Sequence, residues 1–284
     1  MTSRRLLFVH AHPDDEASKG AATAARYADE GAEVVLVTCT GGEAGDVLNP
    51  SAEAVTPEDM PTVRAAELAA AVDAIGFTRT HGLGYVDSGL PEDPADVPEG
   101  TFARVPLDEP STEFAELLRK ERPHVVVTYP EDGGYPHPDH IMTHLMTVRG
   151  MELAEDPAAP VAGDPWRVRK VYASTVFTRE RVLKLHEAML EHHGESPFER
   201  WLKRLEERPA PPPPDALIEV GDWLERRDAA LRAHVTQVDP DGFWFAVPRE
   251  LEREVFPYEG FVLLRSDVAI QPPEDDLFAG LDLE

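Results

Sequence analysis

The amino-acid sequence predicts an α/β fold: a Rossmann-like, mostly parallel sheet flanked by helices, with a smaller C-terminal α+β portion. Two observations support this prediction. Through the first 150 residues, short apolar runs rich in β-branched residues alternate with segments of helical character, as in parallel strands joined by crossover helices. After residue 166 the alternation is less regular. We therefore expect a core over residues 1–165 and a C-terminal portion over residues 166–284 that completes the substrate cleft.

The elements of the core follow from apolar runs and helix-ending residues. Apolar runs predict strands, and Ala-rich or amphipathic segments that stop at Gly31 and Gly76 predict helices with glycine C-caps. Ser111 is a plausible N-cap, and Pro138 suits a first helical turn. We expect strands at 5–11, 34–39, 81–85 and 124–129, helices at 17–30, 60–75, 111–121 and 138–151, and an irregular Pro-rich segment at 91–110.

The C-terminal portion has weaker patterns. Residues 168–177 form a further candidate strand, and residues 178–207 and 222–234 are helical in character. Pro209–Pro214 predicts a stiff connector. The acidic tail from Pro272 is expected to be loose at its end.

Composition excludes several classes of partner. The chain has 27 basic and 54 acidic residues, a formal net charge of -27, and such a field repels nucleic acid and anionic lipid. No apolar run reaches the roughly 18 residues of a transmembrane helix. The single cysteine, Cys39, lies in an apolar run and is expected to be a buried hydrophobic residue. It permits no intramolecular disulfide, which indicates a reducing compartment and a cytoplasmic protein.

Polar clusters follow three of the predicted strands. The first strand leads into His10–Glu16, the second into the glycine-rich loop Gly41–Asp46, and the strand at 124–129 into Tyr135–His140. In open α/β sheets, functional sites form at the carboxyl ends of the strands. Two His/Asp clusters at equivalent strand ends can therefore converge on one ion.

The residue types in these clusters favour a zinc site. Imidazole and carboxylate groups suit Zn²⁺, although Fe²⁺ accepts the same ligands. A catalytic zinc needs three protein ligands and an open position for water, and the remaining groups are then available for acid–base work. His144, one helical turn after His140, is expected to have a packing or surface role. Six residues are candidates for the site: His12, Asp14, Asp15, His137, Asp139 and His140.

The segments Ala-His-Pro-Asp-Asp-Glu at 11–16 and His-Pro-Asp-His at 137–140 resemble the paired motifs of the LmbE-like zinc de-N-acetylase superfamily. Its members hydrolyse N-acetyl groups or related amides on glucosamine conjugates. The likeness extends to the mycothiol branch, which contains S-conjugate amidases and biosynthetic deacetylases. The stretches that carry this wider likeness are 18–23, 40–43, 86–91, 133–140, 232–237 and 277–280.

The resemblance implies a role for each site residue. It makes His12, Asp15 and His140 the ligands of one Zn²⁺ and Asp14 the general base. It makes His137 the general acid or oxyanion-stabilising residue, with Asp139 orienting its ring. Tyr135 would help to polarise the carbonyl. The residues expected to contact the substrate are Lys19, Glu43, Arg64, Asp87 and Gln237.

The activity implied by the resemblance is hydrolysis of the amide of mycothiol S-conjugates, a small-molecule detoxification reaction. Lys19 favours this activity, because the deacetylases usually have a smaller residue at that position. The alternative is removal of acetate from N-acetylglucosaminyl-inositol. A non-catalytic module with a structural metal is a more remote alternative. A phosphoesterase with two metals is less favoured still, because a second ion needs more ligands. The sequence predicts no oligomeric state.

Overall fold

The sheet is built from strands whose alternate residues point to its two faces. The computed structural model describes residues 3–207 and 212–283. Its seven strands lie in the order β3-β2-β1-β4-β5-β7-β6. β1 to β5 are parallel to one another, and β7 is antiparallel to both β5 and β6. The strands are β1 (Arg5–His10), β2 (Glu33–Thr40), β3 (Arg79–Tyr85), β4 (Val125–Thr128), β5 (Lys170–Thr175), β6 (Ala216–Glu219) and β7 (Tyr258–Ser266).

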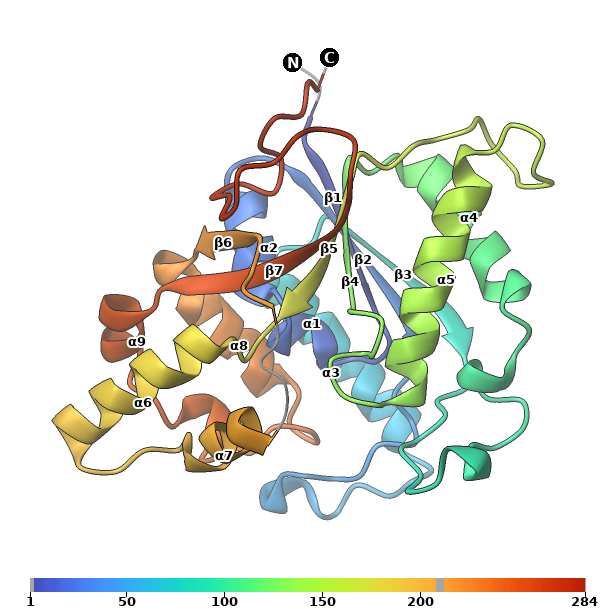
Figure 1. The fold of residues 1–284 in the computed structure, drawn as a ribbon. Coiled ribbons are helices and arrows are strands. Elements are labelled where there is room, and N and C mark those ends of the chain that lie inside the picture. Colours follow the sequence, from blue (N-terminus) through green and yellow to red (C-terminus); the bar gives the residue numbers. More distant parts are fainter. Residues whose placement is uncertain (1–2, 208–211, 284) are drawn as a thin grey trace.

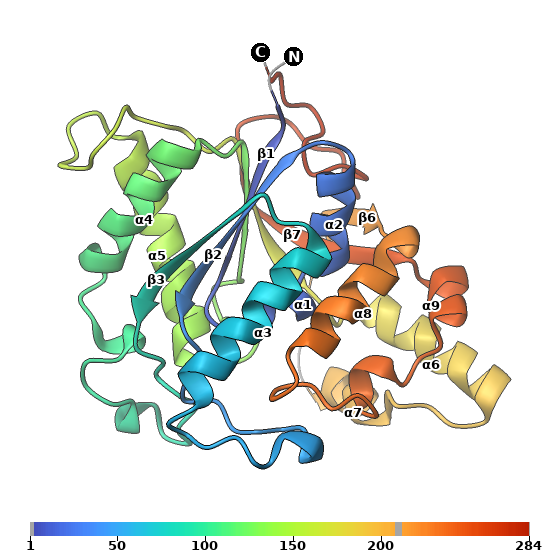
Figure 2. The same cartoon turned by 180° about the vertical axis from the view of Figure 1, so that it is seen from behind.

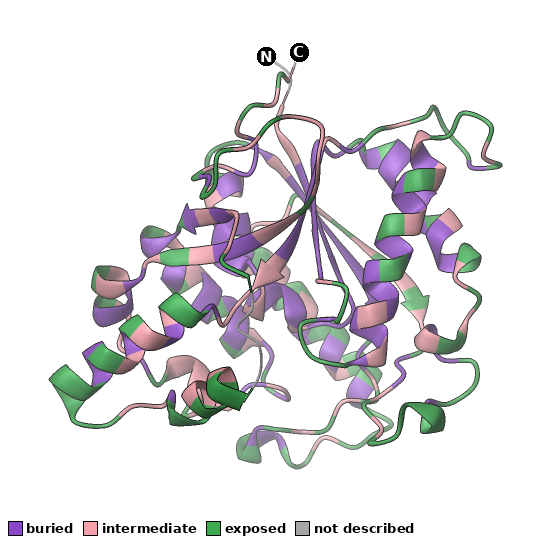
Figure 3. Ribbon diagram, in the orientation of Figure 1, coloured by how far each residue is buried: buried purple, intermediate pink, exposed green. Residues whose placement is uncertain are grey.

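Helices cover both faces of this sheet (Figures 1 and 2). Leu6 and Phe8 of β1 pack with α2 (Ala21–Asp29), α3 (Met60–Ile75) and α8 (Leu224–Ala233). The intervening Leu7 and Val9 pack with α4 (Asp108–Glu121) and α5 (Pro138–Glu155) on the opposite face. Figure 3 shows the resulting buried strands between partly exposed helices. The predicted mixed α/β fold with a mostly parallel sheet is confirmed.

Smaller elements complete the chain. A third apolar cluster joins α6 (Arg179–His193), α7 (Glu199–Glu207) and α9 (Arg249–Val255) beside the antiparallel edge of the sheet. The helix predicted over 178–207 is thus two helices, interrupted after Gly194. The short elements are α1 (Asp15–Ser18) and the 3₁₀ turns η1 (Pro50–Ala52), η2 (Pro94–Asp96), η3 (Phe102–Arg104), η4 (Gly221–Trp223) and η5 (Phe243–Phe245).

The helix predicted over 17–30 is wrong in one respect, because the structure breaks it into α1 and α2. The break lies at Gly20, which has φ 106°, a conformation that glycine adopts without steric cost. A Cβ atom at this position would lie 2.8 Å from the ring of Phe8. The close approach to β1 and the positive φ both require glycine.

The predicted N-cap of α4 is also wrong. The helix begins at Asp108 rather than after Ser111. Ser111 lies inside the helix, where its hydroxyl donates to the carbonyl of Leu107 at 2.6 Å. The prediction started the helix after Pro110, but proline is tolerated in the first turn of a helix.

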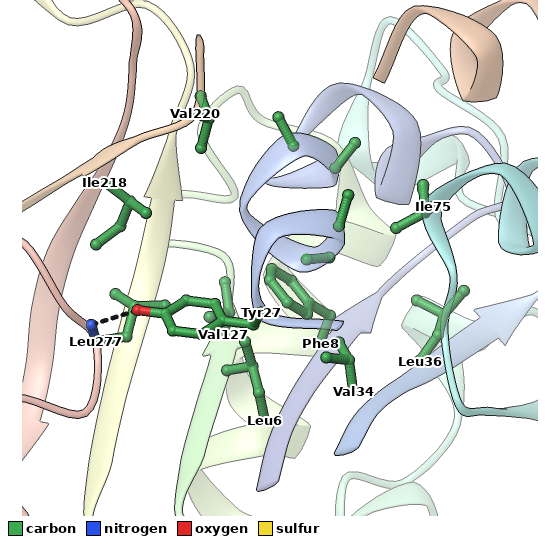
Figure 4. Close-up of a cluster of buried hydrophobic side chains, with 14 of the residues drawn as sticks. Leu6, Phe8, Tyr27, Val34, Leu36, Ile75, Val127, Ile218, Val220 and Leu277 are labelled. Atoms are coloured by element: carbon green, nitrogen blue, oxygen red, sulfur yellow. Dashed lines mark hydrogen bonds between the residues drawn. The ribbon is translucent and has the colours of Figure 1, made fainter. Parts of the chain in front are cut away.

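The acidic tail is not loose, contrary to expectation, up to the last described residues. Leu277 and Phe278 are buried in the core cluster on the α2 side. Figure 4 shows the main-chain N–H of Leu277 donating to the hydroxyl of Tyr27, at 2.7 Å. The connector predicted at Pro209–Pro214 lies partly outside the described residues. Among the residues described, no helix combines the length and apolar character needed to cross a membrane.

Candidate metal centre and active site

The two His/Asp motifs meet at the carboxyl edge of the sheet. β1 and β4 are adjacent and parallel, so the segments that follow them leave the sheet side by side. His12, Asp15 and His140 are all buried, and one potential ligand atom from each lies within 4.8 Å of the others. A second group of the same kind contains His12, His137 and Asp139. The hydrogen bonds around these side chains distinguish the two groups.

The ring of His140 presents a lone pair to the site. Its Nδ1 lies 3.0 Å from the carbonyl oxygen of Gly133, and because a carbonyl only accepts, Nδ1 carries the proton. Nε2 is then an acceptor, and it is buried without a hydrogen-bond partner among the described residues. An imidazole whose other nitrogen is bonded to a main-chain carbonyl is the usual state of a metal-bound histidine.

Asp15 lies at the centre of the group. Its Oδ2 is 3.3 Å from His12 Nδ1 and 3.4 Å from His140 Nε2. The same oxygen accepts a hydrogen bond of 2.6 Å from the hydroxyl of Tyr129, and Oδ1 accepts one from Lys19 Nζ. Burial alone would raise the pKa of Asp15, but Lys19, His140 and His12 hold it well below its usual range. The carboxylate is therefore ionised, as a metal ligand must be.

The ring of His12 is held on both sides by carboxylates. Its Nε2 lies 3.1 Å from Oδ2 of Asp139, which also accepts the main-chain N–H of Ser88 at 3.0 Å. Burial would lower the pKa of His12, but Asp139 and Asp15 raise it to about 10. With Nε2 directed at Asp139, Nδ1 faces Asp15 and is the nitrogen available to a metal.

His137 is arranged differently from His140. Its Nδ1 accepts the main-chain N–H of Asp139 at 3.2 Å, so in the neutral ring the proton lies on Nε2. Burial, together with the nearby His12 and His140, lowers the pKa of His137 to about 3. The ring is thus oriented by the main chain of Asp139, whereas the carboxylate of Asp139 bonds His12. His137 offers an N–H donor where His140 offers a lone pair.

Asp14 is more exposed than the three residues of the metal group. About a third of its side chain is exposed (32%), and its Oδ1 lies 3.4 Å from Arg64 Nη2. Burial, with the negative charge of Asp15, raises the pKa of Asp14 despite the opposing effect of Arg64. Its φ of 102° is unusual for a residue other than glycine. Such strain persists only where surrounding contacts impose it.

The contact that holds this conformation comes from Glu16 and His234. The main-chain N–H of Asp14 donates to Glu16 Oε2 at 2.9 Å. The other carboxylate oxygen of Glu16 bonds Nε2 of His234, and both side chains are fully buried. Burial acts against both charges, yet the pKa of Glu16 is lowered and that of His234 is raised, because each charge stabilises the other. The end of α8 thereby supports the backbone of Asp14.

Arg64 packs against the glycine-rich loop and is not exposed to solvent. It is almost completely buried, and it donates to the carbonyl of Gly42 at 2.7 Å and to that of Pro13. A Cβ on Gly42 or on Gly45 would lie 2.6 Å from atoms of its guanidinium group. The glycines of the loop therefore make room for Arg64, which joins the loop to the first motif.

The other predicted substrate residues line the same edge. Asp87 and Glu43 join their two loops: the N–H of Asp87 donates to Glu43 at 3.0 Å and the N–H of Ala44 to Asp87 at 3.2 Å. Gln237 Nε2 donates to the carbonyl of Asp46 at 3.0 Å, so the C-terminal motif reaches this loop. Tyr135 is 44% exposed, and its ring packs 4.8 Å from that of His140.

Sequence reasoning missed three supporting residues. Tyr129 bonds Asp15 and stacks on His140, with ring centroids 4.2 Å apart. Glu67 accepts both the N–H and the hydroxyl of Thr236, at 2.7 and 2.8 Å, and so fixes the C-terminal motif. Ser88 bonds Asp139. A tyrosine ending a strand or a glutamate within a helix has no local signature, because its role depends on contacts far along the chain. His144 packs as expected, bonding the carbonyl of Tyr129 at 2.8 Å.

The donor set fits a divalent metal. Two imidazoles and one ionised carboxylate converge, and His140 presents a buried lone pair with no other partner among the described residues. A three-ligand site of this kind leaves a position open for water. The fold and the site together define an α/β protein with a candidate mononuclear metal centre at the carboxyl edge of its sheet.

Comparison with known proteins identifies the family. The model of the PIG-L family, described as GlcNAc-PI de-N-acetylase, matches residues 7–151, and the chain belongs to this family, part of the LmbE-like group. It is 47% identical to the mycothiol S-conjugate amidase of Streptomyces coelicolor, over 98% of this chain and 97% of that one. It is 40% identical to the 1D-myo-inositol 2-acetamido-2-deoxy-alpha-D-glucopyranoside deacetylase of Streptomyces avermitilis, over 99% and 98% of the two chains.

A solved structure shows the same fold. The N,N'-diacetylchitobiose deacetylase of Pyrococcus horikoshii superposes with a TM-score of 0.62, over 92% of this chain and 84% of that one, at 19% sequence identity. The family membership makes the chain an enzyme, a hydrolase of the amidase and de-N-acetylase type. The resemblance to the LmbE-like superfamily, inferred from the sequence motifs, is confirmed.

Proposed function

We propose that this enzyme is a zinc-dependent amidase that hydrolyses the glucosaminyl–cysteine amide of mycothiol S-conjugates. The products are a mercapturic acid and glucosaminyl-inositol. The observation that carries this choice is Lys19, whose Nζ bonds Asp15 within the metal group. A long cation next to the metal group can contact an acyl group larger than acetate. The 47% identity to the Streptomyces coelicolor amidase supports the same choice.

His12, Asp15 and His140 would hold the metal. When bound, Zn²⁺ lowers the pKa of a coordinated water towards about 7 and polarises the substrate carbonyl. Fe²⁺ would accept the same ligands. Asp139 keeps the ring of His12 in place through Nε2, and Gly133 does the same for His140 through Nδ1. These contacts preserve the ligand geometry as the substrate enters.

Asp14 acts as the general base. Its carboxylate lies next to Asp15 and is partly open to the site. Asp14 accepts a proton from the attacking water, and the hydroxyl oxygen bonds the acyl carbon. Because His137 offers a single neutral N–H through Nε2, that residue donates a hydrogen bond to the carbonyl oxygen as negative charge develops there. Tyr135 supplies a second donor from its loop.

Collapse of the tetrahedral intermediate breaks the carbon–nitrogen bond. Asp14 then delivers its proton to the leaving nitrogen of the glucosamine. Asp139 orients His137 through its main-chain N–H. Glu43 and Asp87 follow β2 and β3, and Gln237 contacts the loop that carries Glu43. These three residues would bind the sugar hydroxyls. Arg64 contributes by holding their loop.

Removal of acetate from N-acetylglucosaminyl-inositol is the second candidate, supported by relatives of that name at 40–42% identity. Both reactions use the same metal group and the same base. They differ only in the acyl group, so Lys19 is the discriminating residue.

The experiment offers the zinc-loaded enzyme a bimane conjugate of mycothiol and N-acetylglucosaminyl-inositol side by side, with products measured by liquid chromatography and mass detection. We expect a higher kcat/KM for the conjugate. Lys19→Ser should lower conjugate cleavage by about tenfold and acetate release by less, as expected for loss of one charge-assisted contact. Lys184→Ser, on the exposed surface of α6, is the matched control. Equal losses of both activities with Lys19→Ser would contradict the amidase assignment.

A further inference from the structure

A pocket lies beside Lys19, at the carboxyl end of β5. Its lining includes Lys19, Ser174, Arg181, Arg227, Trp244 and Phe261. A second hollow shares Arg181, Arg227 and Trp244 with the first, and it adds the aromatic rings of Phe177, Phe198 and Phe243. The two hollows are therefore neighbours. Their linings together include Lys19, which contacts Asp15, and several aromatic rings next to α6.

Three residues that line the first hollow carry buried polar atoms without hydrogen-bond partners among the described residues. Arg227 is 7% exposed, yet its Nε has no hydrogen-bond partner among the described residues, and the same holds for Arg181 Nε and Ser174 Oγ. Both terminal nitrogens of Arg227 donate to Glu252 at 2.9 Å. Arg181 donates to Glu252 at 2.8 Å and to the carbonyl of Val176 at 3.1 Å. Buried donors are almost always satisfied, so these unused groups indicate a ligand that accepts hydrogen bonds.

The charge balance of this pocket favours a neutral acceptor. Arg181, Arg227 and Arg249 carry three positive charges, and Glu252 and Asp228, which bond them, carry two negative charges. Glu259, which also lines the first hollow, supplies the third negative charge and bonds the N–H of Thr23 at 2.8 Å. Lys19 is paired with Asp15. An amide carbonyl, which accepts hydrogen bonds without adding charge, suits this environment.

The second hollow is aromatic. Within its lining, Phe243 packs 5.7 Å from Phe177 and 6.0 Å from Trp244, measured between ring centroids. Trp201, which is not part of the lining, stacks on Phe177 with centroids 3.7 Å apart. Aromatic surfaces of this kind bind apolar and aromatic groups. The pocket thus combines donors near the metal group with an apolar compartment farther away.

The strand order gives the pocket a direction relative to the substrate. Glu43 and Asp87 follow β2 and β3, the metal group follows β1 and β4, and the pocket lies at β5 and β7. A substrate that places its sugar towards β3 and its amide at the metal group directs its acyl part towards β5. The pocket therefore lies on the acyl side.

We propose that this pocket is the binding site for the acyl half of the substrate, an N-acylated cysteine bearing an apolar S-substituent. The unpartnered donors of Arg181, Arg227 and Ser174 receive its acetamido carbonyl. Trp244 and the aromatic compartment receive the group on sulfur. This assignment deepens the proposed amidase function and rests on it for the orientation of the substrate.

The test measures binding by isothermal titration calorimetry to the zinc-loaded enzyme, so that it does not depend on turnover. The probes are N-acetyl-S-benzylcysteine and N-acetylalanine, which share the carboxylate and the acetamido group and differ in the thioether. We expect the first to bind about tenfold more tightly, because an aromatic group is buried. Trp244→Ala should abolish that preference, and Ser174→Ala should weaken both probes by a similar factor.

Trp223→Ala is the matched control. Trp223 is likewise a half-buried tryptophan packed against the core, but it lies away from the pocket and bonds Asp29 at 2.9 Å. This variant should keep the tenfold preference. Equal binding of the two probes to wild-type enzyme, or an equal loss in both tryptophan variants, would overturn the proposal. Tight binding of N-acetyl-S-benzylcysteine without cleavage of any conjugate would instead overturn the proposed function and leave the pocket assigned.

Discussion

Two hydrogen bonds give neighbouring histidines opposite chemistry at this site. The Nδ1–H of His140 donates to the carbonyl of Gly133, and the main-chain N–H of Asp139 donates to the Nδ1 lone pair of His137. One ring then offers a lone pair and the other an N–H, as the proposed roles of metal ligand and oxyanion donor require. The motif His-Pro-Asp-His identifies both residues as candidates but cannot divide them, because the division depends on main-chain groups whose positions follow from the folded loop.

Asp14 allows a direct test at this scale. Asp14→Asn should lower kcat by about 10²-fold or more, because a general base contributes that much, while bound zinc remains at one per chain. Asparagine is chosen because it tolerates positive φ better than most residues. Kinetics and elemental analysis of the same preparation measure the two effects.

Asp15→Asn is the matched control for Asp14→Asn. It changes the adjacent carboxylate, which contacts His12 and His140, and it should lose zinc together with activity. If Asp14→Asn lost its zinc as well, Asp14 would be a ligand or a structural residue, and its role as base would be refuted.

At the scale of elements, the short helix α1 is supported by the distant end of α8. Glu16 lies between the N–H of Asp14 and the ring of His234, and Glu67 of α3 holds Thr236 two residues further on. The sequence patterns predicted helices at 17–30 and 222–234, which correspond to the regions of α1, α2 and α8. They could not predict the break at Gly20 or the contact between Glu16 and His234, since both result from the packing of α1 and α2 on β1 and α8.

Glu16→Gln tests this support. The amide can still accept the N–H of Asp14, but it loses the ionic contact with His234. We expect kcat to fall by about tenfold with KM and zinc content nearly unchanged, as for a residue that positions the base. Glu67 holds the same C-terminal segment through Thr236 but does not contact Asp14. The control variant Glu67→Gln should therefore retain near wild-type kcat. Equal effects of the two variants would show that Glu16 serves only to hold the segment.

At the scale of the molecule, both portions of the chain build one sheet. The alternating pattern predicted the parallel strands up to residue 150, because buried parallel strands are continuous apolar runs. The edge strand β6 and its neighbour β7 were not predicted, since half-exposed strands with polar residues have weak local signals. The tail was expected to be loose on its acidic composition, yet Glu274 bonds the buried Lys170 at 2.8 Å and Tyr172 at 2.6 Å.

The contact between Glu274 and Lys170 predicts a large effect on stability. Lys170 is fully buried in β5, so Glu274→Ala leaves its charge without a partner and should cost about 3–5 kcal/mol of unfolding free energy. Asp275→Ala, at the exposed neighbouring position, should cost under about 0.5 kcal/mol. The double variant Lys170→Met, Glu274→Leu should recover most of the loss, because it removes both charges. Urea unfolding followed by circular dichroism measures all three. If Glu274→Ala were no less stable than Asp275→Ala, the tail would not anchor the sheet, and a loose tail would be the correct description.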